Sequence, residues 1–269
     1  MKILSVFGTR PEAVKMAPIV RLLAQTPGID SRVCVTAQHR QMLDQVLDLF
    51  QIQPDYDLDL MREGQSLAQL TAGIFLHLDP VLEEVQPDWV LAVGDTTTVV
   101  TTCQLAFYRR IKFGHVEAGL RTHNKWHPFP EEINRRLATT MADLHFAPTQ
   151  RARDNLLREG IERTSIVVTG NTVIDALLTA VQMSWEPELG SLLAGLAPDR
   201  RWILVTAHRR ESFGDGIQGI CRALLQIADR GDVHLVYPVH PNPSVLGPAR
   251  DLLGRHPAIT LTAPLPYSA

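Results

Sequence analysis

The chain has 269 residues, the length of about two domains. Its formal charge is −3, and 45% of its residues are hydrophobic against 20% that are charged. This balance excludes a strongly basic nucleic-acid-binding surface and is typical of a globular protein with a large core. The three cysteines, Cys34, Cys103 and Cys221, lie far apart, which argues against a disulfide scaffold or a cysteine zinc site. No apolar run reaches the roughly 18 residues of a membrane span and no signal peptide is evident, so we predict a cytoplasmic protein with no membrane partner.

Two kinds of segment alternate along the chain. Short and almost continuously apolar runs predict strands that are buried on both faces, namely Ile3–Phe7, Arg32–Thr36, Trp89–Val93, Phe113–Val116, Ser165–Val168, Trp202–Thr206, His234–Val239 and Ala258–Thr262. Between them, apolar residues three and four positions apart predict helices, as in Gln41–Phe50, Gly216–Ala228 and Ser244–Leu253. This alternation predicts an α/β protein with parallel sheets that are covered by helices.

A domain boundary is expected after the turn that ends at Thr172. The first domain then spans residues 1–172 and the second spans residues 173–269. The stretch 173–196 has a helix-like pattern that is interrupted near Pro187. The strand series that follows is short, whereas a doubly wound sheet usually has five or six strands. We therefore predict that the second domain is incomplete and that the chain is cut short.

Polar residues follow several predicted strands at their carboxyl ends, the edge at which open α/β sheets bind ligands. Arg10 precedes a helix and suits a phosphate, although it can also be read as a surface arginine. Asp95 follows the predicted strand Trp89–Val93 and can also serve as a helix cap. Glu117 lies among small residues, and because burying it unpaired would be costly, we expect a partner or a ligand for it.

Further clusters extend this edge. Glu131 opens a predicted helix, where an acidic residue also suits the helix dipole. His208 and Arg210 end the first strand of the second domain and suit a diphosphate, or else form a solvated basic turn. His240 ends the following strand in the equivalent place. A metal site formed by Glu131 and the histidines is an open alternative, and the histidines concerned are His115, His123 and His127. No Gly-x-Gly-x-x-Gly fingerprint of a dinucleotide site is present.

Seven motifs together resemble one known family. They are Phe7-Gly8-Thr9-Arg10-Pro11-Glu12-Ala13, Thr36-Ala37-Gln38-His39-Arg40-Gln41-Met42-Leu43-Asp44, Gly94-Asp95-Thr96-Thr97-Thr98, Gly114-His115-Val116-Glu117-Ala118-Gly119-Leu120-Arg121-Thr122, Pro130-Glu131-Glu132-Ile133-Asn134-Arg135, Thr169-Gly170-Asn171-Thr172-Val173-Ile174-Asp175 and Thr206-Ala207-His208-Arg209-Arg210-Glu211. In order and spacing they closely resemble the non-hydrolysing bacterial UDP-N-acetylglucosamine 2-epimerases, from the first residue of the chain to the last.

The resemblance implies two Rossmann-like domains in the glycosyltransferase-B arrangement and a nucleotide sugar as ligand. The reaction it implies interconverts UDP-N-acetylglucosamine and UDP-N-acetylmannosamine through a glycal, for cell-surface polysaccharide, in a homodimer that requires neither NAD nor a metal. The resemblance assigns acid–base work to three carboxylates, without deciding which is acid and which is base. It assigns contacts with the phosphates to Arg10 and His208. Lys15, Arg210 and His240 are the further substrate-binding residues that it implies. The carboxylates are Asp95, Glu117 and Glu131.

Two departures from the family pattern bear on activity. The family continues for about a hundred further residues, roughly the rest of a domain, which hold the uridine diphosphate. A regulatory substrate site is represented by Gln38 and Gln41, but the basic residue that some members carry near Gly64 is absent. We therefore expect residues 1–269 alone to fold in the first domain, to associate through the second and to show no measurable epimerase activity. The alternatives are a hydrolysing epimerase that releases UDP and free N-acetylmannosamine, and an inactive truncated binder of nucleotide sugars.

Overall fold

The chain folds into two compact units, Met1–Gln182 and Met183–Ala269, and each is described here by itself. The structure is a computed structural model that describes residues 1–36, 40–60, 62, 64–183, 190, 194–196, 199–209, 212–267 and 269, with the backbone alone for residues 40–42. The predicted boundary after Thr172 lies earlier than this division. The reason is that helix α7 (Thr172–Ala180) packs against the first helix, and Thr172 Oγ1 donates a hydrogen bond of 2.6 Å to the Lys15 carbonyl.

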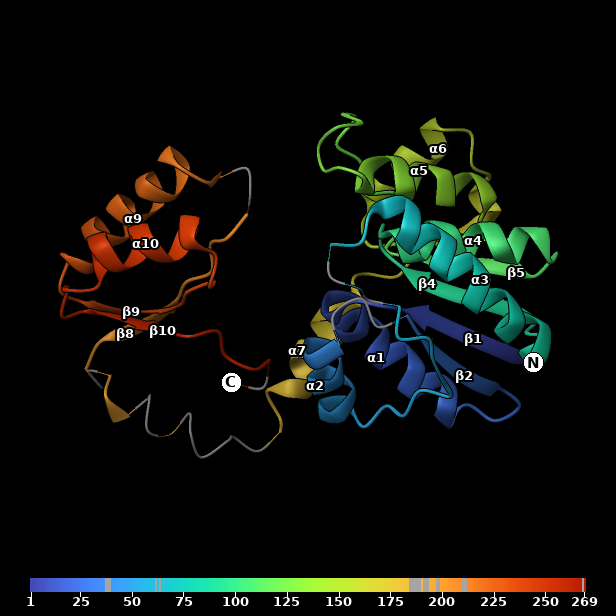
Figure 1. Ribbon diagram of the computed structural model, residues 1–269, viewed down its shortest axis with the longest axis horizontal. Helices are drawn as coiled ribbons and strands as arrows, with labels where there is room; N and C mark the ends of the chain where they lie inside the picture. The colour runs from blue at the N-terminus through green and yellow to red at the C-terminus, as the bar shows by residue number, and fades with distance from the viewer. Residues whose placement is uncertain are drawn as a thin grey trace. The chain divides into compact units, whose positions relative to one another are not determined.

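The first unit is built on a parallel sheet of seven strands (Figure 1). Their order is β3-β2-β1-β4-β5-β6-β7, and each neighbouring pair is parallel. The order reverses between β1 and β4, which is the topological switch point at which such sheets bind ligands. The strands are β1 Lys2–Phe7, β2 Asp30–Val35, β3 Tyr56–Asp57, β4 Trp89–Val93, β5 Lys112–Val116, β6 Leu144–Ala147 and β7 Ile166–Val168.

Helices cover both faces of this sheet. Figure 1 shows α3, α4 and α5 on one face and α1, α2 and α7 on the other. The core between sheet and helices is apolar, and Leu4, Ile74, Leu78 and Phe113 are at most 1% exposed. The helices are α1 Arg10–Gln25, α2 Arg40–Phe50, α3 Leu67–Val85, α4 Thr97–Tyr108, α5 Glu131–Met141, α6 Gln150–Arg158 and α7 Thr172–Ala180, with a 3₁₀ turn at Arg163–Ser165.

The second unit has a smaller parallel sheet of order β10-β9-β8 among its described residues. Its strands are β8 Arg201–Leu204, β9 Val233–Pro238 and β10 Ile259–Thr262, and its helices α9 (Asp215–Ala228) and α10 (Pro243–Leu253) lie on one face of the sheet (Figure 1). Leu235 and Tyr237 of the central strand are buried in a core that both helices share.

The α/β class with parallel sheets is confirmed, and all eight predicted strands form within a few residues of their expected ends. The sequence analysis missed β3, which has two residues, and β6, whose short run contains His145. The expectation that every apolar run is buried on both faces is wrong for β8, all of whose residues are exposed, and for Val167 and Val168 of β7, which are 44% and 38% exposed; both strands lie at an outer edge of their sheet. The helix-like pattern of residues 173–196 forms α7 only as far as Ala180, and residues 184–189 and 191–193 lie outside the described residues.

Every helix within the described part of the chain is too short or too polar to cross a membrane.

Candidate active site

The site of the first unit begins where β1 and β4 end, on the two sides of the switch point. Arg10 is the first residue of α1, and Asp95 lies in the turn between β4 and α4. Gly8 lets the first loop pass close to its neighbours, because a Cβ there would lie 1.9 Å from Thr36 Oγ1. Arg10 is partly exposed and makes no hydrogen bond or ion pair with the described residues, so its guanidinium is available to an anion at the amino end of the helix.

Asp95 is held by two residues of α5. Arg135 Nη2 donates to its carboxylate at 2.5 Å, and Asn134 Nδ2 donates to its backbone carbonyl at 3.0 Å. Burial raises the pKa of Asp95 above its ordinary value, Arg135 opposes this, and the negative charges of Glu117 and Glu131 add to it. Glu117 and Glu131 therefore lie close enough to Asp95 to act on its carboxylate electrostatically.

Glu117 is the most tightly constrained of the three carboxylates. It follows β5 directly and has a φ of +62°, in the left-handed region that a non-glycine residue adopts at an energetic cost. Lys15 Nζ donates to its Oε2 at 2.5 Å and Asn171 Nδ2 donates to its Oε1 at 2.8 Å. A Cβ on Gly94 would lie 3.5 Å from Oε2, so the carboxylate lies against the turn that carries Asp95.

Glu131 has a buried carboxylate oxygen without a partner. It is the first residue of α5, and its Oε2 is buried and accepts no hydrogen bond from the described residues. The adjacent Glu132 is instead fully engaged, since its carboxylate accepts from the backbone N–H groups of Thr122 and His123 at 3.0 and 3.1 Å. Of these two neighbouring acids, Glu132 anchors the loop before the helix and Glu131 is left to interact with a ligand.

The structure brings Lys15 to a carboxylate, whereas the sequence analysis assigned it to substrate. It also adds Arg135, Asn134 and Asn171, to which the sequence analysis gave no role. Asn171 belongs to a motif at the carboxyl end of β7, so its position at the strand edge was a usable signal. Arg135 gave no such signal, because a mid-helix arginine is ordinarily a solvated residue.

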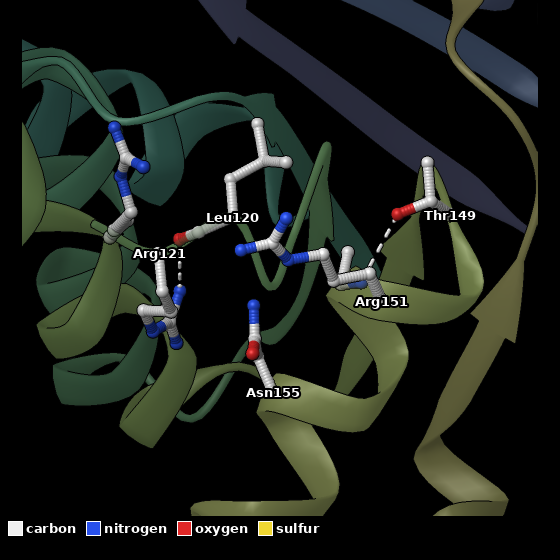
Figure 2. Close-up of a pocket in the computed structure, with 7 residues that line it drawn as sticks. Leu120, Arg121, Thr149, Arg151 and Asn155 are labelled. Atoms are coloured by element: carbon white, nitrogen blue, oxygen red, sulfur yellow. Dashed lines mark hydrogen bonds between the residues drawn. The ribbon is translucent and has the colours of Figure 1, made fainter. Parts of the chain in front are cut away.

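A pocket of about 270 Å³ adjoins this site through Arg135, which lines it together with Arg121, Arg151 and Asn155 (Figure 2). Arg121 is fixed there by Glu159, to which its Nε and Nη2 donate at 2.8 and 2.7 Å. The pocket thus borders the segment that follows Glu117.

The candidate residues of the second unit lie at the ends of β8 and β9. The exposed rings of His208 and His240 stack with centroids 5.2 Å apart, as expected from neighbouring parallel strands. Tyr237 Oη donates to the Ala207 carbonyl at 2.7 Å and so holds the segment that carries His208. A hollow of about 410 Å³ is lined by His208, Arg209 and Thr206 among others.

Several sequence predictions fall outside the described residues. Gln38 and Arg210 are among these, and so is the side chain of Gln41. The alternative of a metal site is disfavoured, because His115 is fully buried and its Nε2 is bonded to the Gly94 carbonyl at 2.7 Å. Within the part of the chain that the structure describes, no three His, Cys, Asp or Glu side chains are grouped to hold a metal ion.

The chain is similar to known proteins along its whole length. The family model described as UDP-N-acetylglucosamine 2-epimerase matches residues 21–269. The UDP-N-acetylglucosamine 2-epimerase of Escherichia coli K12 is 53% identical over 99% of this chain and 73% of its own length. The crystal structure of UDP-GlcNAc 2-epimerase from Neisseria meningitidis bound to UDP-GlcNAc is 46% identical, with a TM-score of 0.91 over 100% of this chain and 74% of that chain.

A co-structure of S. aureus MnaA with UDP is 45% identical, with a TM-score of 0.87 over 99% of this chain and 70% of that one. The Neisseria meningitidis structure covers the whole of this chain and so every candidate residue, whereas the family model begins at residue 21, after Arg10 and Lys15. This chain belongs to the UDP-N-acetylglucosamine 2-epimerase family.

Proposed function

We propose that the protein interconverts UDP-N-acetylglucosamine and UDP-N-acetylmannosamine by elimination and re-addition of UDP. The observation that carries the proposal is the grouping of Asp95, Glu117 and Glu131 at one edge of the sheet, where Glu117 and Glu131 both act on the charge of Asp95. The relatives that are named as 2-epimerases, and the Neisseria meningitidis structure that holds UDP-GlcNAc, support this substrate.

The substrate itself dictates the kind of chemistry. The hydrogen at carbon 2 of the sugar is not next to a carbonyl, so its direct removal as a proton is too costly. The bond between carbon 1 and the UDP oxygen breaks instead, and its electron pair leaves with UDP. A carboxylate removes the proton of carbon 2, and the electrons of that C–H bond form a double bond between carbons 1 and 2. The product is a glycal. Addition of UDP to carbon 1 and return of a proton to the other face of carbon 2 inverts that centre.

The side chains of the first unit match these needs. The elimination requires a base and the re-addition an acid, and the three carboxylates supply both. Burial raises the pKa of Asp95 and so shifts this carboxyl toward the protonated form that a general acid needs. Arg10 stabilises the charge that develops on the departing diphosphate, and we assign His208 and Arg210 to the same task.

The proposed reaction needs no nicotinamide cofactor, because the hydrogen leaves and returns as a proton, and we propose, as the family resemblance implies, that it requires no metal. As the family resemblance implies, we propose that the product supplies mannosamine units for cell-surface polysaccharide and that the enzyme acts in the cytoplasm. Whether substrate activates the enzyme through Gln38 and Gln41 is a separate prediction.

We also propose a homodimer formed by the helical layer of α3 and α4. Leu76, Phe107 and Tyr108 are 71%, 62% and 62% exposed on these two adjacent helices, a concentration of apolar surface that favours association. Sedimentation velocity of the protein and of Phe107→Arg tests this. A protein that sediments as a monomer at micromolar concentration contradicts it.

The deciding experiment for the reaction is turnover of UDP-N-acetylglucosamine in heavy water, followed by proton NMR. We expect UDP-N-acetylmannosamine with deuterium at carbon 2. Product without deuterium at that carbon contradicts the elimination mechanism, and free N-acetylmannosamine with UDP identifies a hydrolysing enzyme instead. Because the chain spans 73% of the length of its Escherichia coli relative, the assay is run on residues 1–269 and on the protein extended to the length of its relatives.

A further inference from the structure

Glu12 is a buried carboxylate at the point where the two loops of the switch point meet. The residue lies in the first turn of α1 and is 4% exposed. Its Oε2 accepts hydrogen bonds from the backbone N–H groups of Gly8 and Thr9 at 3.0 and 2.7 Å. Its Oε1 accepts one from Thr96 Oγ1 at 2.6 Å. A single side chain therefore joins the loop after β1 to the loop after β4.

Only part of this arrangement is an ordinary helix cap. Thr9 and Glu12 form a capping box at the start of α1. The same unit has a second capping box at the start of α3, made by Ser66 and Gln69. There the Gln69 side chain accepts a hydrogen bond from the Ser66 N–H, and this side chain is neutral and exposed. Capping a helix in this fold thus needs neither a charge nor burial.

Burying the Glu12 carboxylate costs desolvation free energy, and a helix cap alone does not require that cost. Removal from water raises the pKa of this carboxyl, and the hydrogen bonds from Thr96, Gly8 and Thr9 oppose that rise. An ionised carboxylate accepts on both oxygens, which is what three donors from two loops require. The bond from Thr96 adds nothing to the capping of α1, so its contribution lies in joining the loops.

The residues joined in this way are neighbours of two candidate active-site groups. Arg10 follows Thr9, and Asp95 precedes Thr96. We propose that Glu12 is a positioning residue that sets the separation between Arg10 and Asp95 by bridging the two loops. Its effect on turnover rests on the function proposed above, whereas the bridge itself does not.

Four variants separate this role from capping. Glu12→Ala removes both acceptor oxygens, Thr96→Val removes the bridging hydroxyl together with the cap that it provides for Val99 of α4, and Thr96→Ser keeps both. Gln69→Ala is the matched control, because it breaks the other capping box away from the site. Each is compared with the parent by kcat, KM and melting temperature in the form of the protein that turns over.

We expect Glu12→Ala and Thr96→Val each to lower kcat by about 10²-fold, the order of effect known for small misplacements in active sites. The double variant should be no worse than the more damaging single one, because both break the same bridge, whereas additive losses would trace the effect of Thr96→Val to the lost cap of α4 and overturn the proposal. Thr96→Ser should keep kcat within about threefold of the parent, and Gln69→Ala should change only the melting temperature. A Glu12→Ala protein with parental kcat and a lower melting temperature also overturns the proposal.

A measurement without turnover tests the bridge directly. Amide hydrogen exchange at Gly8 and Thr9 should accelerate in Thr96→Val, although the substitution lies 87 or more residues away along the chain, and should stay unchanged in Gln69→Ala. Unchanged exchange in Thr96→Val overturns the proposal. If no form of the protein converts UDP-N-acetylglucosamine, the proposed function fails while the bridge is still decided by this measurement.

Discussion

The two units build parallel sheets from similar apolar runs but cover them to different degrees. In the first unit, β1 and β4 lie inside a sheet of seven strands with helices on both faces, and Leu4 and Val90 are completely buried (Figure 1). In the second unit, β8 is an outer strand in which Trp202 and Leu204 are 47% and 73% exposed. An apolar run therefore predicts a strand, whereas burial depends on what the rest of the fold places beside it.

The same difference extends to the polar side chains at the strand ends. In the first unit, Asp95 and Glu117 each receive hydrogen bonds from side chains of other elements. In the second unit, His208 and His240 are exposed and stack on each other. Groups that transfer protons need a fixed geometry and low solvent access, so the contacts of Asp95 and Glu117 support the acid–base role proposed for the first unit.

The largest expected effect comes from removing a proton acceptor in the first unit. Glu117→Gln preserves shape but abolishes proton transfer, so kcat should fall by about 10²–10⁴ while UDP binding is retained. Steady-state kinetics and calorimetry with UDP measure the two effects. Glu84→Gln is the control, because Glu84 is an exposed carboxylate that only accepts a hydrogen bond from Tyr56. Parental activity of Glu117→Gln would remove this residue from the acid–base set.

A pair of leucines tests the difference in cover within the second unit. Leu235→Ala in the central strand β9 should lower the free energy of unfolding by about 2–5 kcal/mol, because Leu235 is completely buried. Leu204→Ala in β8, where the side chain is 73% exposed, should change it by no more than about 0.5 kcal/mol. Urea unfolding followed by tryptophan fluorescence measures both. Equal losses would mean that β8 is covered in solution.

His115, one of the two buried histidines among the described residues of the first unit, should make stability depend on pH. Burial lowers the pKa of His115 from 6.5 to about 4, so the unfolded chain binds a proton in this range that the folded chain does not. Stability from this group is complete above pH 6.5 and falls by about 3 kcal/mol as the pH drops to 4. Unfolding of the parent and of His115→Gln across this range measures the effect. The same loss of stability between pH 6.5 and 4 should be seen in His77→Gln, which alters an exposed histidine. If His115→Gln loses as much stability over this range as the parent, the assignment to His115 is contradicted.

The smallest effect on stability is expected for a charge on the exposed strand. Leu204→Lys should leave the unfolding free energy within about 0.5 kcal/mol of the parent but reduce self-association, because charged residues on outer strands oppose edge-to-edge pairing. Light scattering at increasing concentration measures this. Gln226→Lys, which places the same charge on an exposed position of α9, should not reduce association; an equal reduction would assign the effect to net charge.

Much of the fold follows from local sequence patterns. The run Trp89–Val93 forms β4 with the predicted ends, and the periodic segment before Phe50 forms α2. Such patterns depend only on side chains within a few positions of one another. The short strand β6 escaped notice because its four residues include a buried histidine, which is bonded to the carbonyls of Ser165 and Thr139.

The sequence by itself determined the alternation of strands and helices, and it placed Arg10, Asp95 and Glu117 at the carboxyl ends of their strands. Only the tertiary structure decided which side chains meet there. Lys15 and Glu117 are 102 positions apart, and Asn171 and Glu117 are 54 apart, yet both pairs form hydrogen bonds. Strand order and the left-handed backbone at Glu117 direct these contacts. Because they arise from packing between distant elements, no local pattern encodes them.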